Sequence, residues 1–397
     1  MDMGETGSDN DQPPGKLKRV AVSVFRYFPQ GGIQMKLLNL VKELASDGIR
    51  VVVFCITCDM AEEIPGVEFR TLPAKGLTRY GKARRFNALL QEVLEKEKFD
   101  LHIAFSKVSG ADWYFADSSP FTCESARSRW YHKYMPWYRT FAALEKAVFA
   151  PESSTKIICF SVAQQQEFQK LYATQGDRIY IMPPGIDPEY RNALAQRENR
   201  RKICRKKLNV SMDDKVLLTV ASAARAKGVD RAIAALASLP GAERSCTRLY
   251  VAGWGDMLKF KQLARRLGVE TQVKFCGWVD DIETLYSGAD LVLHPARRES
   301  SGAVLLESIA CGTPVVCSGN CGFADSVSDS GGEVLGVPFR QKQLNRTLLM
   351  LLSVPGKLEE LQFAAAEYAA TVDFFSRSKA MAELLKRSFS DVQKSDS

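Results

Sequence analysis

Residues 290–318 read DLVLHPARRESSGAVLLESIACGTPVVCS, and this stretch decides the fold class. The apolar run LVLH is followed by a polar loop, by a helical segment that ends near Cys311 and Gly312, and by a second apolar run, PVVCS. Short β-branched runs that alternate with helices are typical of parallel sheets covered by crossover helices. We therefore predict a strand, a crossover helix and a parallel strand in this stretch.

Units of the same kind extend toward both ends of the chain and form two series. The second series begins at Lys215 with KVLLTVA and continues through RLYVAG, VKFCG and DLVLH to PVVCS. The first begins at Arg19 with RVAVSVF and continues through RVVVFCI, VEFRTL, LHIAF and KIICF to RIYIM. Between them lies PPGID, residues 183–187, whose consecutive prolines continue neither a helix nor a strand. We predict an α/β protein with two Rossmann-like domains whose parallel sheets face a cleft between them.

The length of the chain supports this division, because 397 residues exceed what a single hydrophobic core usually holds. We assign a flexible tail to residues 1–17, one domain to 18–184, a second domain to 185–375, and a C-terminal helix that returns to the first domain, followed by a tail, to 376–397.

The composition is that of a soluble globular protein, with 25% charged and 46% apolar residues. No apolar run reaches the roughly 18 residues that a membrane-spanning helix needs, and the N-terminus is neither a signal peptide nor an anchor. The ten cysteines lie mostly inside apolar runs and lack the paired spacing of a zinc site. We therefore expect a cytoplasmic protein with reduced thiols and no metal site.

Basic and aromatic residues alternate in RSRWYHKYMPWYRTFAALEKAVF, residues 127–149, within a chain of formal net charge +8. Such a segment suits the surface of an anionic membrane. The alternative is the core stripe of a buried helix, formed by the aromatic residues at positions 130, 134, 137, 138 and 141. No nucleic-acid-binding motif is present, so we expect no nucleic acid as a partner. The residues predicted to contact the membrane are Arg129, Trp130, Lys133, Tyr134, Trp137 and Arg139.

Two loops that lead from a strand into a helix could hold a phosphate. In the first, Gly31 and Gly32 precede a helix, where free amides and the helix dipole favour an anion. In the second, Arg225 and Lys227 precede Gly228 and another helix, so that two cations could neutralise a departing diphosphate. A tight turn and solvated loop cations, respectively, are the alternatives without a function.

The stretch 290–318 carries one acid in its loop, Glu299, and another on its helix, Glu307. A carboxylate can accept hydrogen bonds from sugar hydroxyls, and the amides between Ser301 and Val304 could bind phosphate. The alternative is an acid-enriched helix N-terminus without a ligand. Sequence spacing does not give the separation of two carboxylates, so nothing here indicates a glycosidase pair.

An NAD-dependent oxidoreductase is an alternative, because Gly253-Trp254-Gly255 follows a predicted strand as in a dinucleotide-binding motif. Leu258 stands where the third glycine of that motif belongs, which disfavours an NAD-dependent oxidoreductase. A membrane-docked carbohydrate-binding scaffold without activity is the other alternative.

The sequence resembles the retaining GT-B glycosyltransferases of family 4, and within them the lipopolysaccharide core glucosyltransferase I type. The resemblance runs from about Val20 to Ala370 through YFPQGGIQ, SKVSGADWYFA, RIYIMPPGI, KGVDRAIAALASLP, ADLVLHPA, ESSGAVLLES and GTPVV. It implies a GT-B fold and transfer of glucose from UDP-glucose, or another nucleotide sugar, to an inner-core heptose or similar lipid-linked glycan. It also implies retention of the anomeric configuration, no metal or cofactor, and peripheral attachment to the inner face of the cytoplasmic membrane.

By position, the resemblance implies particular site residues. Gly31 and Gly32 approach the donor, Arg178 lines the cleft, Lys227 binds the diphosphate, Val279 lies by the base, Glu299 holds sugar hydroxyls, Ala303 and Val304 give amides to phosphate, and Glu307 holds the ribose; Ser222, Arg225 and Gly302 complete the donor set. Asp112 and Glu299 are the catalytic candidates, with Asp112 as the acceptor-side base or orienting group. Close relatives carry an arginine immediately before Lys227, where this chain has Ala226 and places Arg225 one residue earlier.

Overall fold

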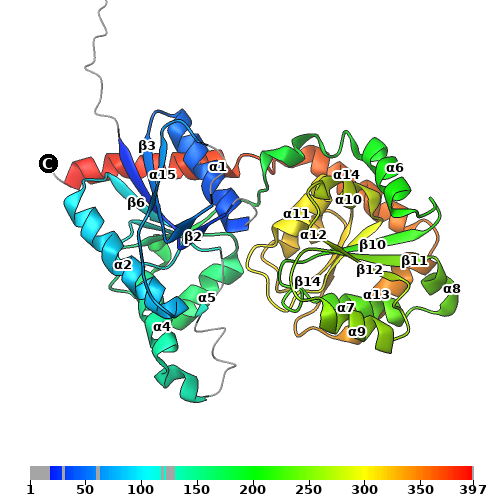
Figure 1. Ribbon diagram of the computed structural model, residues 1–397. Helices are drawn as coiled ribbons and strands as arrows, with labels where there is room; N and C mark the ends of the chain where they lie inside the picture. The colour runs from blue at the N-terminus through cyan, green and yellow to red at the C-terminus, as the bar shows by residue number, and fades with distance from the viewer. Residues whose placement is uncertain (1–17, 29–31, 60–62, 118–119, 122–129, 396–397) are drawn as a thin grey trace, which may run out of the picture.

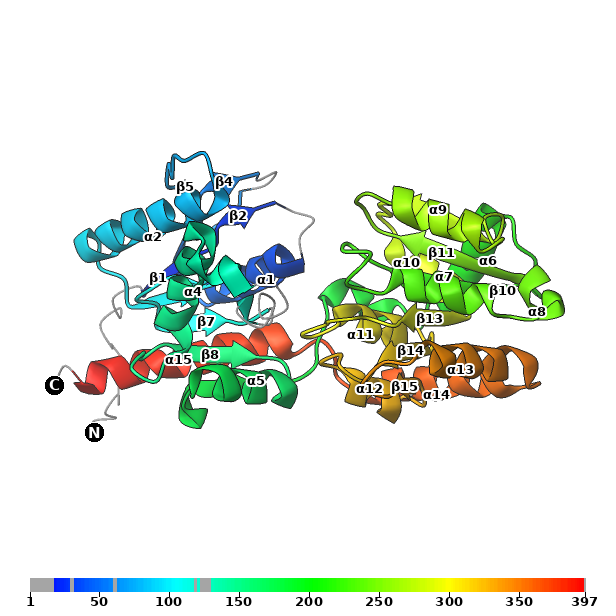
Figure 2. The same ribbon diagram turned by 90° about the horizontal axis from the view of Figure 1, so that it is seen from below.

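The computed structural model describes residues 18–28, 32–59, 63–117, 120–121 and 130–395. Two α/β domains lie side by side, each built on a parallel sheet (Figures 1 and 2). The α/β class and the two Rossmann-like domains predicted from the sequence are confirmed.

The N-terminal domain is built on a sheet in which each pairing is parallel. In spatial order its strands are β5 (Val67–Thr71), β3 (Arg50–Cys55), β1 (Arg19–Ser23), β6 (Leu101–Ala104), β7 (Trp113–Phe115), β8 (Lys156–Cys159) and β9 (Ile179–Ile181). A parallel pair, β2 (Arg26–Tyr27) and β4 (Thr57–Cys58), extends beyond β1 and β3. The strands are almost entirely apolar because helices cover both faces of a parallel sheet.

The helices of this domain pack through apolar stripes. In α1 (Gly32–Ser46), Leu37, Leu40, Val41 and Leu44 are buried at helical spacing. The other helical segments are α2 (Arg79–Lys96), η1 (Trp130–Tyr134), α4 (Pro136–Phe149), α5 (Val162–Tyr172) and η2 (Gly176–Arg178).

The C-terminal domain has a second parallel sheet with helices on both faces. Its strands, in spatial order, are β12 (Val273–Gly277), β11 (Thr247–Ala252), β10 (Lys215–Val220), β13 (Leu291–His294), β14 (Val315–Ser318) and β15 (Glu333–Leu335). Leu217 packs in the apolar cluster beneath α7 (Val229–Ala237), whereas Leu218 belongs to the cluster on the opposite face. This alternation follows from the two-residue period of a strand.

The remaining helices of the C-terminal domain complete its two layers (Figure 1). They are η3 (Pro188–Asn192), α6 (Arg197–Leu208), α8 (Gly241–Ser245), α9 (Leu258–Arg266), α10 (Ile282–Gly288), α11 (Ala303–Ala310), α12 (Ala324–Asp329), α13 (Gln341–Ser353) and α14 (Lys357–Thr371).

The chain passes between the domains along two adjacent segments. The first contains Ile186, and the second contains Phe374 and leads into α15 (Arg377–Ser395). The Ile186 amide donates a hydrogen bond to the Phe374 carbonyl at 2.9 Å, so the two segments are tied together. The helix α15 lies against the N-terminal domain, where Trp113 Nε1 donates to Ser388 Oγ at 3.2 Å.

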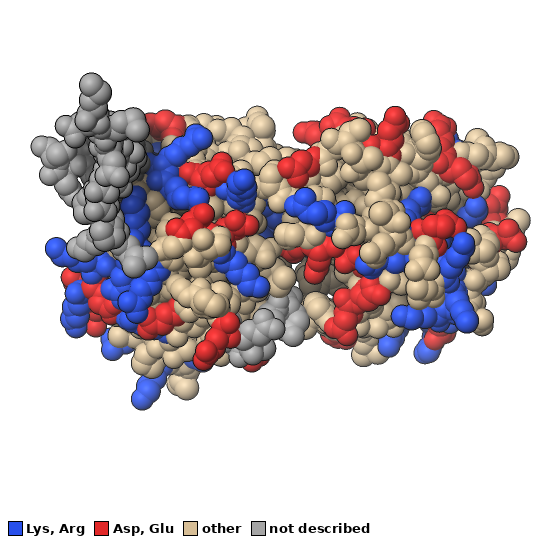
Figure 3. All heavy atoms as spheres, turned by 90° about the horizontal axis from the view of Figure 1, so that it is seen from above, with Lys and Arg blue, Asp and Glu red and all other residues tan. Residues whose placement is uncertain are grey.

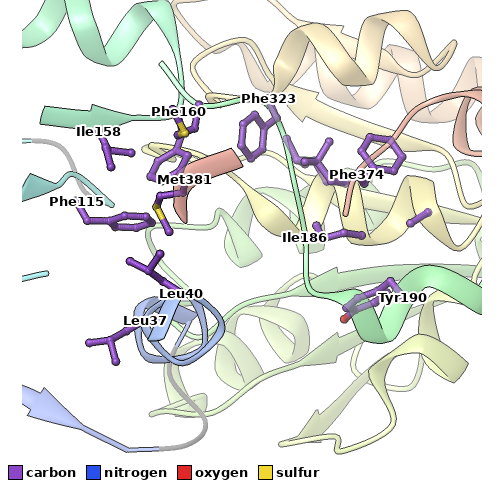
Figure 4. Packing of buried hydrophobic residues seen from close by; sticks show 14 of the residues in the cluster. Leu37, Leu40, Phe115, Ile158, Phe160, Ile186, Tyr190, Phe323, Phe374 and Met381 are labelled. Atoms are coloured by element: carbon purple, nitrogen blue, oxygen red, sulfur yellow. The ribbon is translucent and has the colours of Figure 1, made fainter. Parts of the chain in front are cut away.

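One apolar cluster continues from domain to domain through these segments. In Figure 4, Phe160 and Met381 lie close to the N-terminal sheet, Phe323 belongs to the C-terminal domain, and Ile186 and Phe374 belong to the two segments that cross between the domains. Because buried apolar area stabilises both halves at once, the two domains are joined by packing as well as by covalent bonds.

The surface view in Figure 3 shows basic and acidic side chains interspersed over both domains. The face drawn there therefore has no extended surface of one sign. None of the helices in the described part of the chain combines the length and the apolar character needed to cross a bilayer.

Candidate active site

The centre of the candidate site is the carboxylate of Glu299, in the loop after β13. Its Oε2 atom accepts from the Lys227 ammonium and lies 2.9 Å from His294 Nε2. Because a carboxylate only accepts, the hydrogen of this second contact belongs to His294. Burial alone would raise the pKa of Glu299, but the bond from His294 and the charge of Lys227 outweigh it and lower the pKa to about 2. Glu299 is therefore an ionised acceptor.

The N-terminus of α11 lies directly after this loop. Gly302 has a φ of +89°, and a Cβ there would lie 3.1 Å from Glu299 Cγ. A side chain would therefore be strained and would crowd the carboxylate. The amides of Ala303 and Val304 begin the helix, where the helix itself provides no acceptor. Free amides and the helix dipole suit a phosphate beside the Glu299 carboxylate.

Arg297 holds the loop that carries Lys227 in place. The guanidinium of Arg297 donates to the Arg225 carbonyl at 2.9 Å and makes a bidentate ion pair with Asp230 at 2.7 and 2.6 Å. Gly228 has a φ of +78°, and a Cβ there would lie 2.1 Å from the Pro295 carbonyl oxygen. The close approach of this loop to the end of β13 brings Lys227 to Glu299.

Glu307 lies about one turn into α11 and is half-buried. It accepts a hydrogen bond from the Tyr286 hydroxyl at 2.8 Å. Burial, together with the charges of Asp187 and Glu189, raises the pKa of Glu307 to about 7, although the Tyr286 bond and Lys36 act in the opposite direction. Glu307 therefore changes ionisation near neutral pH.

A cavity of about 1320 Å³ opens between the two domains beside this group. Ser222, Arg225 and Glu299 line it from the C-terminal domain, and the residues of α5 line it from the N-terminal domain. The remaining predicted donor residues do not line the cavity: Lys227 and Gly302 to Val304 adjoin Glu299, Gly32 begins α1, and Val279 follows β12 and packs on the core. Gly31 lies outside the described residues.

Known proteins match both halves of the chain. The family model Glycosyltransferase Family 4 matches residues 30–190, and the model Glycosyl transferases group 1 matches residues 200–388. The lipopolysaccharide glucosyltransferase WaaG of Escherichia coli K12 is 36% identical over 369 residues, which cover 92% of this chain and 98% of that protein. The chain belongs to the family 4 glycosyltransferases. The crystal structure of WaaG matches with a TM-score of 0.86 at 34% identity, covering 92% of this chain and 99% of that one.

Membership in this family confirms the GT-B fold and excludes the oxidoreductase alternative. Anabaena HepE, solved in complex with UDP-glucose, matches with a TM-score of 0.70 at 20% identity over 93% of this chain and 99% of that one. At that identity the likeness supports the fold alone.

The structure of this glycosyltransferase corrects the expectation for Arg178. Its guanidinium does not line the cleft; the residue is 7% exposed and lies within the N-terminal domain. It donates to the main-chain carbonyls of Phe149 at 3.3 Å and Ala150 at 3.2 Å, and also to that of Ser153. Arg178 therefore satisfies the carbonyls at the C-terminus of α4, where a helix leaves them without partners.

The expectation for Asp112 is corrected as well. Asp112 precedes β7, and its carboxylate accepts from the His102 amide at 2.7 Å. Asp112 therefore lies at the edge of the sheet where the parallel strands begin. The cavity lies at the edge where they end, since Ser161, which follows β8, lines it. Asp117 follows β7 at that edge and forms an ion pair with Lys36 of α1. Asp117, not Asp112, is the acidic residue of this segment on the cleft side.

Sequence reasoning missed three side chains near the site. His294 was not among the predicted site residues, yet it contacts the Glu299 carboxylate. Lys36 and Asp117 were not singled out, and the charge of Lys36 also reaches Glu307 in the other domain. Position after a parallel strand was the signal available for Asp117, since carboxyl ends of such strands carry the ligand sites. Within the described ranges, no group of three or more metal-ligating side chains occurs.

The aromatic and basic segment divides into an exposed and a packed part. Trp130 and Tyr134 of η1 are 75% and 69% exposed, and Lys133 and Arg139 are also exposed. Trp137 contacts the ring of Phe121 and is only half-buried. The core-stripe alternative is therefore wrong for the residues of η1, while Arg129 lies outside the described residues.

Proposed function

We propose that this protein transfers glucose from UDP-glucose to a heptose of the lipopolysaccharide inner core or a similar lipid-linked glycan, with retention of configuration. The observation that carries the proposal is the Glu299 carboxylate, held by Lys227 and His294 at the N-terminus of α11. The similarity to WaaG over 92% of the chain supports the choice of substrates.

The geometry suits each part of a nucleotide sugar. Lys227 and His294 both contact the Oε2 atom of Glu299, and among the described residues Oε1 has no hydrogen-bond partner. Oε1 is thus free to accept from a sugar hydroxyl. The amides of Ala303 and Val304 receive the diphosphate, and Glu307 accepts from the ribose when it is ionised. The diphosphate competes with Glu299 for Lys227, so donor binding rearranges this ion pair.

In the proposed reaction, the bond between the anomeric carbon and the diphosphate oxygen breaks, and the acceptor oxygen bonds to the anomeric carbon on the same face. The acceptor proton passes to the departing phosphate oxygen, and the diphosphate keeps the electron pair of the broken bond. Lys227 and the first amides of α11 offset the charge that develops on the diphosphate, so no metal ion is needed. Asp117 orients the acceptor hydroxyl from the opposite domain.

Calorimetry tests the donor site directly. The protein is titrated with UDP-glucose, UDP-galactose, UDP-N-acetylglucosamine, GDP-mannose and NAD, and the titrations are repeated with Lys227→Ala. We expect UDP-glucose to bind and the variant to lose most of this binding.

Turnover tests the reaction. We expect UDP release and glucose incorporation with a heptose-terminated glycolipid, and NMR of the product to show the α-anomer expected for retention from UDP-α-glucose. Binding of UDP-glucose without turnover on any lipid-linked glycan would support the non-catalytic scaffold instead. Unchanged binding in Lys227→Ala would refute the site.

We also propose that η1 and the start of α4 contact the cytoplasmic face of an anionic membrane. Exposed Trp130 and Tyr134 beside Lys133 and Arg139 combine interfacial rings with cations. Sedimentation with phosphatidylglycerol vesicles should remove the wild-type protein from solution, and the double variant Trp130→Ala/Tyr134→Ala should stay in solution. Equal sedimentation of the variant would refute this surface.

A further inference from the structure

The interdomain cavity meets the proposed donor site at one end only. Of the donor residues, Ser222, Arg225 and Glu299 line the cavity. Glu299 is proposed for the sugar hydroxyls, and Arg225 belongs to the loop proposed for the departing diphosphate. Val279 and Glu307, proposed for the base and the ribose, do not line it. The cavity therefore extends from the transferred sugar and its departing phosphate away from the ribose and the base. The molecule that must approach the sugar from this side is the acceptor.

The size of the cavity agrees with an occupant longer than one sugar. Its volume of about 1320 Å³ lies above the roughly 300 to 1,000 Å³ of ordinary small-ligand pockets. A single hexose at Glu299 leaves most of this space to another ligand.

The wall on the side of the C-terminal domain carries an indole ring without a protein partner. Trp254 lines the cavity and is 52% exposed. Among the described residues its ring has no aromatic or cation contact and its Nε1 no hydrogen bond. The backbone before it is firmly placed, because the Gly253 amide donates to the Gly277 carbonyl at 2.7 Å. A Cβ on Gly253 would lie 2.0 Å from the Ala221 carbonyl oxygen, so only glycine fits there.

The opposite wall is one face of α5. Ala163, Gln166, Glu167, Lys170 and Leu171 line the cavity at helical spacing. The first turn of the helix is anchored separately by buried Gln164, whose Nε2 donates to the Ala116 carbonyl at 2.8 Å. The polar side chains of the face are thus not required to hold α5 in place and can serve a ligand.

A rigid indole opposite amide, carboxylate and ammonium groups is suited to a sugar chain. The apolar C–H face of a pyranose packs on an aromatic ring, while its hydroxyl groups need donors and acceptors around the edge. A lipid tail would leave the polar groups of α5 buried without partners, which is costly.

We propose that the groove between α5 and Trp254 is an oligosaccharide subsite for the acceptor, in which Trp254 stacks on a sugar beyond the one that receives the hexose. This inference rests on the proposed function and adds the path of the acceptor to it. Gln166 and Lys170 hydrogen-bond the same sugar chain from the other domain, so acceptor binding brings the two walls together.

The test is a steady-state comparison of wild-type protein, Trp254→Ala, Trp254→Phe and Gln166→Ala/Lys170→Ala. The donor is UDP-glucose, and the acceptor is the lipid-free oligosaccharide of a heptose-terminated inner core, which removes any effect of a membrane. We expect Trp254→Ala to raise the acceptor KM about tenfold, the loss that corresponds to one aromatic stacking contact. Trp254→Phe should raise the acceptor KM less than Trp254→Ala does. The donor KM should stay unchanged in all variants.

Trp278→Ala is the matched control. Trp278 is 51% exposed and follows β12 in the same domain, yet it does not line the cavity. Its replacement should leave the acceptor KM unchanged.

A second measurement does not depend on turnover. With UDP present, titration of the oligosaccharide should change the tryptophan fluorescence of the wild-type protein more than that of Trp254→Phe.

The outcomes separate the two proposals. An active wild-type protein with an unchanged acceptor KM in Trp254→Ala, or with a raised donor KM instead, would overturn the subsite alone. A wild-type protein that transfers no glucose to any inner-core acceptor would overturn the proposed function and the subsite with it.

Discussion

At the scale of single residues, Glu307 is where pH acts on the site. Its folded pKa of about 7 lies above the ordinary 4.5, so folding favours the protonated form. The stability that this proton contributes is full below about pH 4.5 and is lost as pH rises through 7. Glu307→Gln stays neutral at every pH. In urea titrations, the unfolding free energy of this variant minus that of the wild type should therefore increase from pH 5 to pH 8. Glu95→Gln, at an exposed position, is the control. A difference in unfolding free energy between Glu307→Gln and wild type that does not change with pH would contradict the prediction.

Asp112 and Asp117 should separate stability from activity. Asp112→Ala leaves the buried His102 amide without its acceptor, which should cost about 1–3 kcal/mol of unfolding free energy and leave kcat of the folded enzyme unchanged. Asp117→Asn should lower kcat at least tenfold with about 1 kcal/mol or less of destabilisation, because its ion pair with Lys36 is partly solvated. Urea titration and the transfer assay measure the two effects. The opposite pattern would restore Asp112 as the acceptor-side acid.

At the scale of elements, the turn into α7 is a place where only glycine fits. Gly228→Ala brings a Cβ to 2.1 Å from the Pro295 carbonyl at a φ of +78°, and we expect a loss of about 2–4 kcal/mol from strain and overpacking together. Gly268→Ala has a similar φ of +69° but open space around its Cβ, so it should lose only the strain, about 1–2 kcal/mol. Urea titrations compare the two, and equal losses would show that the Pro295 contact yields.

The elements also show what the sequence could and could not reveal. Most of the strands in the two sheets were predictable because both faces of each sheet are covered, which makes these strands almost wholly apolar. The three-residue strands β7 and β15 were not in the predicted series. The Glu299 loop was predictable because a strand end and a helix start define it locally. The role of Arg178 was not, since its partners at the end of α4 depend on tertiary packing. Asp112 and Asp117 flank the same short strand, and only the direction of β7 distinguishes their edges.

At the scale of the whole molecule, the site depends on how the domains approach each other. Glu307 and Lys227 belong to one domain, whereas Asp117 and Lys36 belong to the other. The charge of Lys36 already reaches Glu307 across the boundary. Since the two crossing segments are tied by the bond from Ile186 to Phe374, we expect them to act as one hinge. Closure at such a hinge excludes water and completes the set of reacting groups.

Gly185 lies in a tightly packed part of these crossing segments. A Cβ there would lie 2.6 Å from the Cβ of Arg377 and 3.1 Å from the Phe374 carbonyl oxygen, so Gly185→Ala must push the crossing segments apart. Small misplacements of reacting groups are costly, and we expect kcat to fall on the order of tenfold to a hundredfold. Calorimetric binding of UDP-glucose should change little, because most of the proposed donor contacts lie within the C-terminal domain. Gly241→Ala, with open space around its Cβ, should keep wild-type kinetics. If Gly185→Ala keeps them too, the domains reach their reactive arrangement without this contact, and the hinge is not what aligns the two halves of the site.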